Sequence, residues 1–113
     1  MEIRETIAGD VTTIELQGRF TVTDPPGLLK DTVSGAIDRG ARHVLLDLSG
    51  VHYLDSTRLG ELIAAYVTVS RRGGRLTLVA TPHRISDLLT IAGLDRIFEQ
   101  FPTAAEATKG LAS

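Results

Sequence analysis

The sequence of 113 residues contains no cysteine and no tryptophan, and aromatic side chains make up only 4% of it. Without cysteine, a disulfide framework, a thiolate metal site and a cysteine nucleophile are all excluded. The scarcity of aromatic rings argues against a surface that stacks bases or sugars. The formal net charge is −2, so no broad cationic surface marks a nucleic-acid partner.

Long apolar segments are also missing. No apolar run approaches the roughly 20 residues that a helix needs to cross a bilayer, so we expect no direct membrane insertion. Residues 1–10 lack the basic start and the apolar stretch of a signal peptide, which makes the cytoplasm the expected location. The length, with 42% hydrophobic and 23% charged residues, predicts one globular domain over residues 1–113.

Segments with the two-residue period of a strand alternate along the chain with segments that have the period of a helix. The expected strands are residues 2–7, 11–17, 43–50, 75–79 and 96–101, and the expected helices are residues 25–39, 56–72, 82–92 and 104–111. Strands that alternate with helices predict mainly parallel pairing, and the opening hairpin adds one antiparallel strand. We therefore predict an α/β fold, a mostly parallel mixed β-sheet of about five strands with about four helices.

The ends of the first two helices carry residues suited to capping. Asp24 can cap the first helix, and Gly40 suits its C-terminal stop. The second helix opens in the stretch "YLDSTRLGEL", where Ser56 or Thr57 is the expected N-cap. The apolar residues of this helix fall on one predicted inward face, namely Leu59, Leu62, Ile63, Tyr66 and Val67.

The segment "HVLLDLSG", residues 43–50, is a continuous apolar run that ends in Ser-Gly. Such a run predicts a strand that is buried on both faces, as in parallel sheets covered by helices. We expect Ser49 and Gly50 to close this strand.

The reactive side chains form no recognisable catalytic or metal-binding group. The three histidines are not spaced as zinc ligands, and only His52 lies near a carboxylate, that of Asp55. Ser56 lacks the G-x-S-x-G elbow of a serine hydrolase. Asp47 lacks the neighbouring carboxylates that would hold Mg²⁺ beside a phosphorylated aspartate. We expect no catalytic residue, no metal site and no cofactor.

The adjacent hydroxyls of Ser56 and Thr57 have two compatible interpretations. In the first, one of the two hydroxyls is the helix N-cap and has no other role, and the cap contributes about 1 kcal/mol. A hydroxyl at a helix start can also accept a phosphate, because the positive end of the helix dipole tolerates the charge. A phosphate would add about −1.5 to −2 charges beside Asp55 and would repel a partner docked over this helix end.

The segment "HVLLDLSGVHYLDSTRLGELIAA", residues 43–65, resembles the STAS domain, the family of anti-sigma factor antagonists and related modules. The pattern of that family is an apolar strand with "DLSGV", a short variable stretch and "DS[ST]GLG" at the start of a helix. Residues 47–51, 55–57 and 59–60 match it, and residues 71–79 and 83–107 are similar to the second half of the family.

The resemblance implies a partner-switching protein without catalytic residues of its own. In the unphosphorylated state such an antagonist binds an anti-sigma factor, itself a serine kinase, and so frees a sigma factor for transcription. The kinase then phosphorylates the serine after the aspartate of the motif, which is Ser56 here, with Thr57 as a less favoured acceptor. A separate phosphatase resets the protein.

Two residues depart from the family pattern. Arg58 replaces the glycine of the motif, and it can pair with Asp55, pair with a phosphate on Ser56 or point into solvent, the commonest case for an exposed arginine. Thr21 stands where the family often has an aspartate, in a loop that flanks the phosphorylation site. The resemblance places the partner surface on seven residues: Thr21, Asp24, Asp55, Ser56, Thr57, Arg58 and Leu59.

The resemblance also leaves a second function open. A STAS domain can be a structural or regulatory subunit of a larger complex, such as the ATPase of a membrane transporter. In that case Ser56 and Thr57 would contact a partner without being phosphorylated.

Overall fold

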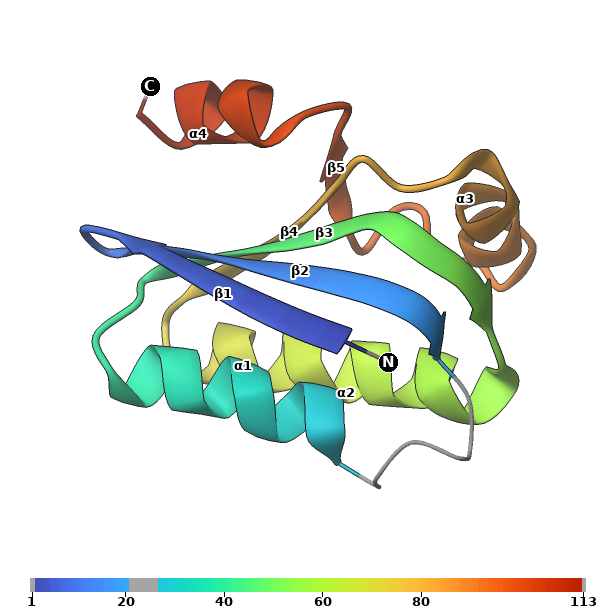
Figure 1. Ribbon diagram of the computed structural model, residues 1–113, viewed down its shortest axis with the longest axis horizontal. Coiled ribbons are helices and arrows are strands. Elements are labelled where there is room, and N and C mark those ends of the chain that lie inside the picture. Colours follow the sequence, from blue (N-terminus) through green and yellow to red (C-terminus); the bar gives the residue numbers. More distant parts are fainter. Residues whose placement is uncertain (1, 21–26, 113) are drawn as a thin grey trace.

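The computed structural model describes residues 2–20 and 27–112 (Figure 1). Nine elements follow one another along the described chain. They are β1 (Glu2–Ala8), β2 (Val11–Phe20), α1 (Leu28–Asp38), β3 (His43–Leu54), α2 (Ser56–Arg71), β4 (Arg75–Val79), α3 (His83–Ile91), β5 (Glu99–Phe101) and α4 (Ala104–Ala112). This order of strands and helices is the order predicted from the sequence.

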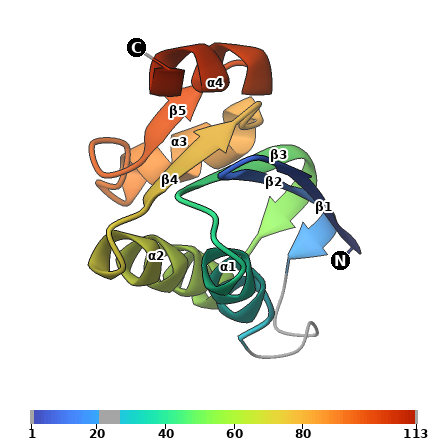
Figure 2. The same cartoon turned by 90° about the vertical axis from the view of Figure 1, so that its left-hand side faces the viewer.

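The five strands form one sheet in the order β1-β2-β3-β4-β5. β1 pairs with β2 in antiparallel orientation, and the remaining pairs are parallel. The predicted α/β fold with a mixed, mostly parallel sheet is therefore confirmed. α1 and α2 lie side by side on one face of the sheet, and α4 lies on the other side (Figures 1 and 2).

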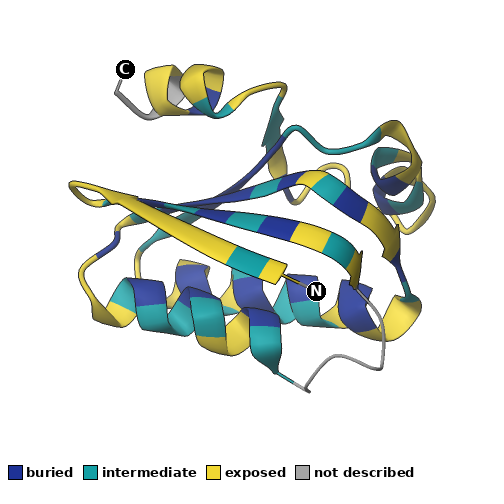
Figure 3. Ribbon diagram, in the orientation of Figure 1, coloured by how far each residue is buried: buried dark blue, intermediate teal, exposed yellow. Residues whose placement is uncertain are grey.

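The main core fills the space between the sheet and the two helices α1 and α2. Figure 3 shows the buried residues of these helices on the sides that meet the sheet. In β3, Val44 and Leu46 face this core, whereas Leu45 joins Val79 and Ala107 in a smaller cluster that includes α4. Because alternate residues of a strand point to opposite faces, β3 is buried on both faces here, as predicted.

Strands β2 and β3 are both longer than expected. β3 does not close at Gly50 but continues to Leu54, and β2 continues past Gly18 to Phe20. Two register shifts interrupt their pairing near these glycines, after which the pairing resumes. A Cβ atom at Gly50 would lie 2.8 Å from the side chain of Gln17, so this glycine permits a close approach of the two strands instead of ending one.

α1 differs from the sequence expectation in its start, and α2 differs in its buried face. α1 begins at Leu28 after Gly27, whose φ of 79° is left-handed and suits glycine, while the expected cap Asp24 lies outside the described residues. In α2, Val67 is 37% exposed although it was predicted to face inward. The buried side of α2 instead follows Leu59, Leu62, Ala65 and Val69. None of the described helices is both long and apolar enough to span a membrane.

Candidate functional site

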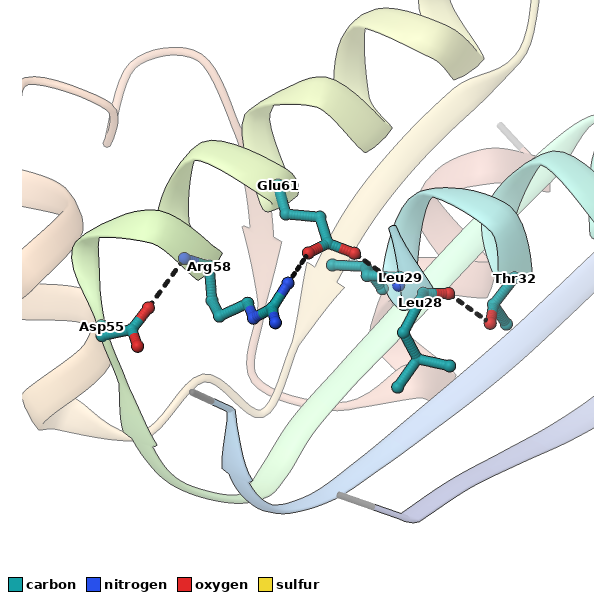
Figure 4. Close-up of polar contacts among 6 residues, drawn as sticks. All are labelled: Leu28, Leu29, Thr32, Asp55, Arg58 and Glu61. Atoms are coloured by element: carbon teal, nitrogen blue, oxygen red, sulfur yellow. Dashed lines mark hydrogen bonds and ion pairs between the residues drawn. The ribbon is translucent and has the colours of Figure 1, made fainter. Parts of the chain in front are cut away.

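The start of α2 directly follows the end of β3, so the sheet fixes its position. Asp55 is the single residue between them and has an extended backbone, with φ −86° and ψ 172°. Its Oδ1 atom accepts a hydrogen bond from the backbone N–H of Arg58 at 2.8 Å (Figure 4). Asp55 is therefore the N-cap of α2.

The expectation that Ser56 or Thr57 caps the helix is wrong by one residue. Both are instead the first two residues inside α2, and both are exposed. The carboxylate of Asp55 is the cap because it reaches the third helical N–H. It also places a negative charge at the positive end of the helix dipole. The fold consequently leaves both hydroxyls at the surface, at an end of the helix that favours negative charge.

Arg58 does not point into solvent. It is 3% exposed, and its guanidinium lies 2.5 Å from the Oε2 atom of Glu61, one helical turn further along α2. The Glu61 side chain is itself only 9% exposed. A charged group so deeply buried needs a compensating charge, and Glu61 provides one.

The second oxygen of Glu61 reaches across to the neighbouring helix. Its Oε1 atom accepts a hydrogen bond from the backbone N–H of Leu29 at 2.8 Å (Figure 4). The N-cap of α1 is Gly27, which has no side chain to bond these first N–H groups. Arg58, Glu61 and Leu29 therefore form a chain of contacts, named here the interhelix bridge, that joins the starts of α2 and α1.

Sequence reasoning missed this bridge. Arg58 and Glu61 stand three residues apart, a spacing at which side chains on a helix meet, so the ion pair had a signal in the sequence. The contact with Leu29 had none, because the two residues are 32 positions apart and meet only after both helices pack on the sheet.

The structure brings only part of the predicted partner surface together. Asp55, Ser56 and Thr57 lie at the surface or near it, at the end of β3. Leu59 is only 9% exposed and belongs to the main core, so it supports the helix and is not available to a partner. Thr21 and Asp24 lie outside the described residues.

No metal-binding cluster marks this region in the part of the chain that the structure describes. Within residues 2–20 and 27–112, no group of three or more His, Cys, Asp or Glu side chains is placed to hold a metal ion. Away from this region, Arg75 on β4 and Glu99 on β5 form an ion pair. Their side-chain hydrogen bond raises the pKa of Arg75 and lowers the pKa of Glu99.

Comparison with known proteins agrees with the resemblance seen in the motif. The family model described as the STAS domain matches residues 2–107. A protein of Thermotoga neapolitana named "putative anti-sigma factor antagonist" is 37% identical over 71 residues. The matched segment covers 63% of this chain and 63% of that relative.

Solved structures share the fold over nearly the whole chain. A crystal structure titled as a "putative anti-sigma factor antagonist" of Thermotoga maritima has a TM-score of 0.88 and 25% identity, and the match covers 98% of this chain and 95% of that one. The anti-sigma factor antagonist SpoIIAA in its unphosphorylated form has a TM-score of 0.80 over 98% of this chain and 96% of its own, and at 17% identity this likeness shows the fold alone. The match of the family model over residues 2–107 shows that the chain belongs to the STAS domain family.

Proposed function

We propose that this protein is an anti-sigma factor antagonist whose binding surface is switched by phosphorylation of Ser56. The observation that carries the proposal is the position of Ser56, which is exposed and stands first in α2 directly after the Asp55 cap. The cap is made by Asp55 and not by the serine, so the hydroxyl is free to be modified without loss of the helix start. The relative from Thermotoga neapolitana bears the corresponding name.

In the proposed cycle the unphosphorylated protein binds an anti-sigma factor that is also a serine kinase. Asp55, Ser56 and Thr57 form the described part of the contact surface. The kinase supplies the nucleotide and the catalytic groups, and the antagonist supplies only the acceptor hydroxyl, with Thr57 as the less favoured acceptor. A phosphatase removes the phosphate and restores binding. Because the partners act on transcription, the cycle belongs in the cytoplasm.

The local electrostatics account for release after phosphorylation. A phosphate on Ser56 adds about −1.5 to −2 charges next to the carboxylate of Asp55. The start of α2 tolerates this charge, but a docked partner would have to desolvate it. The nearest arginine in the sequence, Arg58, is buried and its charge is already matched by Glu61. The phosphate therefore changes the surface that the partner meets more than it changes the fold.

The test is the intact mass of the protein purified from its native host, before and after phosphatase treatment, followed by peptide mapping. We expect the mass of one phosphate on the peptide that carries Ser56, and we expect it to disappear with the phosphatase. Ser56→Ala should abolish the modification, whereas Thr57→Ala should preserve it, which makes the two variants matched controls.

Two other outcomes would redirect the proposal. Loss of the phosphate in Thr57→Ala but not in Ser56→Ala would move the acceptor by one residue. An unmodified mass under several growth conditions, together with co-purification of a membrane transporter complex, would reject the switch in favour of a structural subunit.

A further inference from the structure

An apolar groove lies between the end of β3 and α3, the helix seen at the right of Figure 1. Its volume is about 660 Å³. The apolar part of its lining is made by Tyr53, Leu54, Ile85, Leu88 and Ile91. Neither the Asp55 cap nor the interhelix bridge uses this groove.

Two residues of the groove present apolar surface to solvent. Ile91 is 84% exposed and Tyr53 is 40% exposed, and both are among the five large hydrophobic side chains that are exposed in the described chain. Leu54 and Ile85, in contrast, are buried and form the floor. An exposed apolar rim over an apolar floor is typical of a surface that another molecule covers.

An exposed arginine at the rim can pair with an acidic occupant. Arg84 lines the groove, is exposed and has no ion-pair partner among the residues that the structure describes. Asp87, the acid of the rim, lies 3.2 Å from the Nε2 atom of His83. The guanidinium of Arg19 lies 4.5 Å from the centre of the Tyr53 ring and adds a second cation at this end of the sheet.

The groove lies close to Ser56 along the chain. Tyr53 and Leu54 are the last residues of β3, and Asp55 and Ser56 follow at once. Three peptide units separate Tyr53 from Ser56, so their Cα atoms are at most about 11 Å apart. A partner that contacts the hydroxyl of Ser56 is therefore within reach of the groove.

We propose that the groove receives a segment of the anti-sigma factor that carries a large apolar side chain next to a carboxylate. The apolar side chain would cover Ile91 and Tyr53, and the carboxylate would pair with Arg84. This inference rests on the proposed function and adds the chemistry of the partner segment. It also gives a reason why a phosphate on Ser56 would release the partner, because the segment that the phosphate repels is itself acidic.

The groove variants are Ile91→Ser and Arg84→Glu, and both alter exposed side chains. The matched controls are Ile7→Ser, which changes an isoleucine of β1 that is 61% exposed, and Arg71→Glu, which reverses an exposed charge at the far end of α2. We expect each groove variant to weaken binding of the purified kinase about tenfold or more. The controls should stay within about twofold of the unmodified protein. Circular dichroism checks that all four are folded.

A second measurement does not depend on the kinase. Two peptides, Ac-Glu-Leu-Leu-Glu-NH₂ and Ac-Lys-Leu-Leu-Lys-NH₂, are titrated into the ¹⁵N-labelled protein at millimolar concentration. The acidic peptide should cause saturable shifts of the amide signals of Tyr53, Leu88 and Ile91, the basic peptide should cause smaller ones, and Arg84→Glu should abolish the difference.

The outcomes separate this inference from the proposed function. If Ser56→Asp abolishes kinase binding while both groove variants bind like the controls, the groove is not part of the interface and the phosphorylation switch stands. If no serine kinase binds the unmodified protein, the proposed function fails. The peptide titration then shows by itself whether the groove binds an acidic apolar segment. Equal responses to both peptides, or no saturable shift at the groove, would overturn the inference.

Discussion

Glu61 on α2 and Leu29 on α1 are joined by a hydrogen bond of 2.8 Å, in which the Leu29 backbone N–H donates to the Glu61 carboxylate. The other oxygen of the same carboxylate lies 2.5 Å from the Arg58 guanidinium. Arg58 replaces a glycine of the family motif, and the bridge shows what the replacement does. The arginine is part of a joint between two helices and not an exposed addition to the surface near Ser56.

The first prediction concerns the charge of Glu61. Glu61→Gln keeps the shape of the side chain but removes the negative charge that compensates Arg58. We expect the free energy of unfolding to fall by about 2 kcal/mol, measured by urea denaturation at neutral pH. Glu2→Gln, which changes an exposed glutamate of β1, should alter it by less than about 0.5 kcal/mol. Equal effects of the two substitutions would mean that the bridge contributes nothing.

The second prediction concerns the dependence of Arg58 and Glu61 on each other. Arg58→Met removes the charge and retains much of the apolar stem, and the double variant with Glu61→Gln removes both charges. We expect the double variant to be more stable than the sum of the single changes predicts, by about 1 kcal/mol or more. Strictly additive losses would show that the two side chains act independently, whatever their separation.

The fold was predictable because its signals are local. Period-two and helical patterns are set within a few residues, and their alternation leaves few topologies other than a mostly parallel sheet. The N-cap of α2 was misplaced by one residue because Asp55, Ser56 and Thr57 are all good caps, and only the backbone geometry at the end of β3 selects the first.

The burial of Arg58 was not predictable in the same way. An arginine at a helix start is usually exposed, and the sequence gives no sign that the start of α1 packs beside the start of α2. The glycine cap of α1 has no side chain that could bond the N–H of Leu29, and a carboxylate from the neighbouring helix bonds it instead. Such a contact depends on the packing of two helices and is invisible to any pattern within one of them.

The third prediction tests the cap. Asp55→Ala removes the acceptor for the Arg58 backbone N–H, and we expect a loss of about 1 kcal/mol in the free energy of unfolding. Asp55→Asn keeps a side-chain oxygen at the same place and should lose less. Thermal or urea denaturation of the two variants gives the comparison. A larger loss in the asparagine variant than in the alanine variant would contradict the role of the oxygen as a cap.

The fourth prediction concerns pH and the pair of Arg75 and Glu99. The hydrogen bond from Arg75 lowers the pKa of Glu99 below its ordinary value, so the folded state holds the Glu99 proton less tightly than the unfolded chain does. The resulting stability is present above the ordinary pKa of a glutamate and is lost as the pH falls through the lowered value.

Glu99→Gln should therefore reduce the difference in unfolding free energy between neutral and acidic pH. Arg75→Met should reduce it in the same way, because it removes the cause of the lowered pKa. Urea denaturation at a series of pH values gives this difference for each protein. If neither variant changes it, the ion pair does not contribute to the acid sensitivity of the fold.

The last prediction separates charge from size at the proposed switch. Ser56→Asp places a negative charge at the start of α2, where the helix dipole favours it, so stability should change by less than about 0.5 kcal/mol. Binding of the kinase should be abolished. Ser56→Asn has nearly the same shape without the charge and should retain most of the binding, as measured by calorimetry with the purified kinase. Wild-type affinity in the aspartate variant would falsify charge repulsion, and equal losses in both variants would assign the effect to size, because only size is common to the two substitutions.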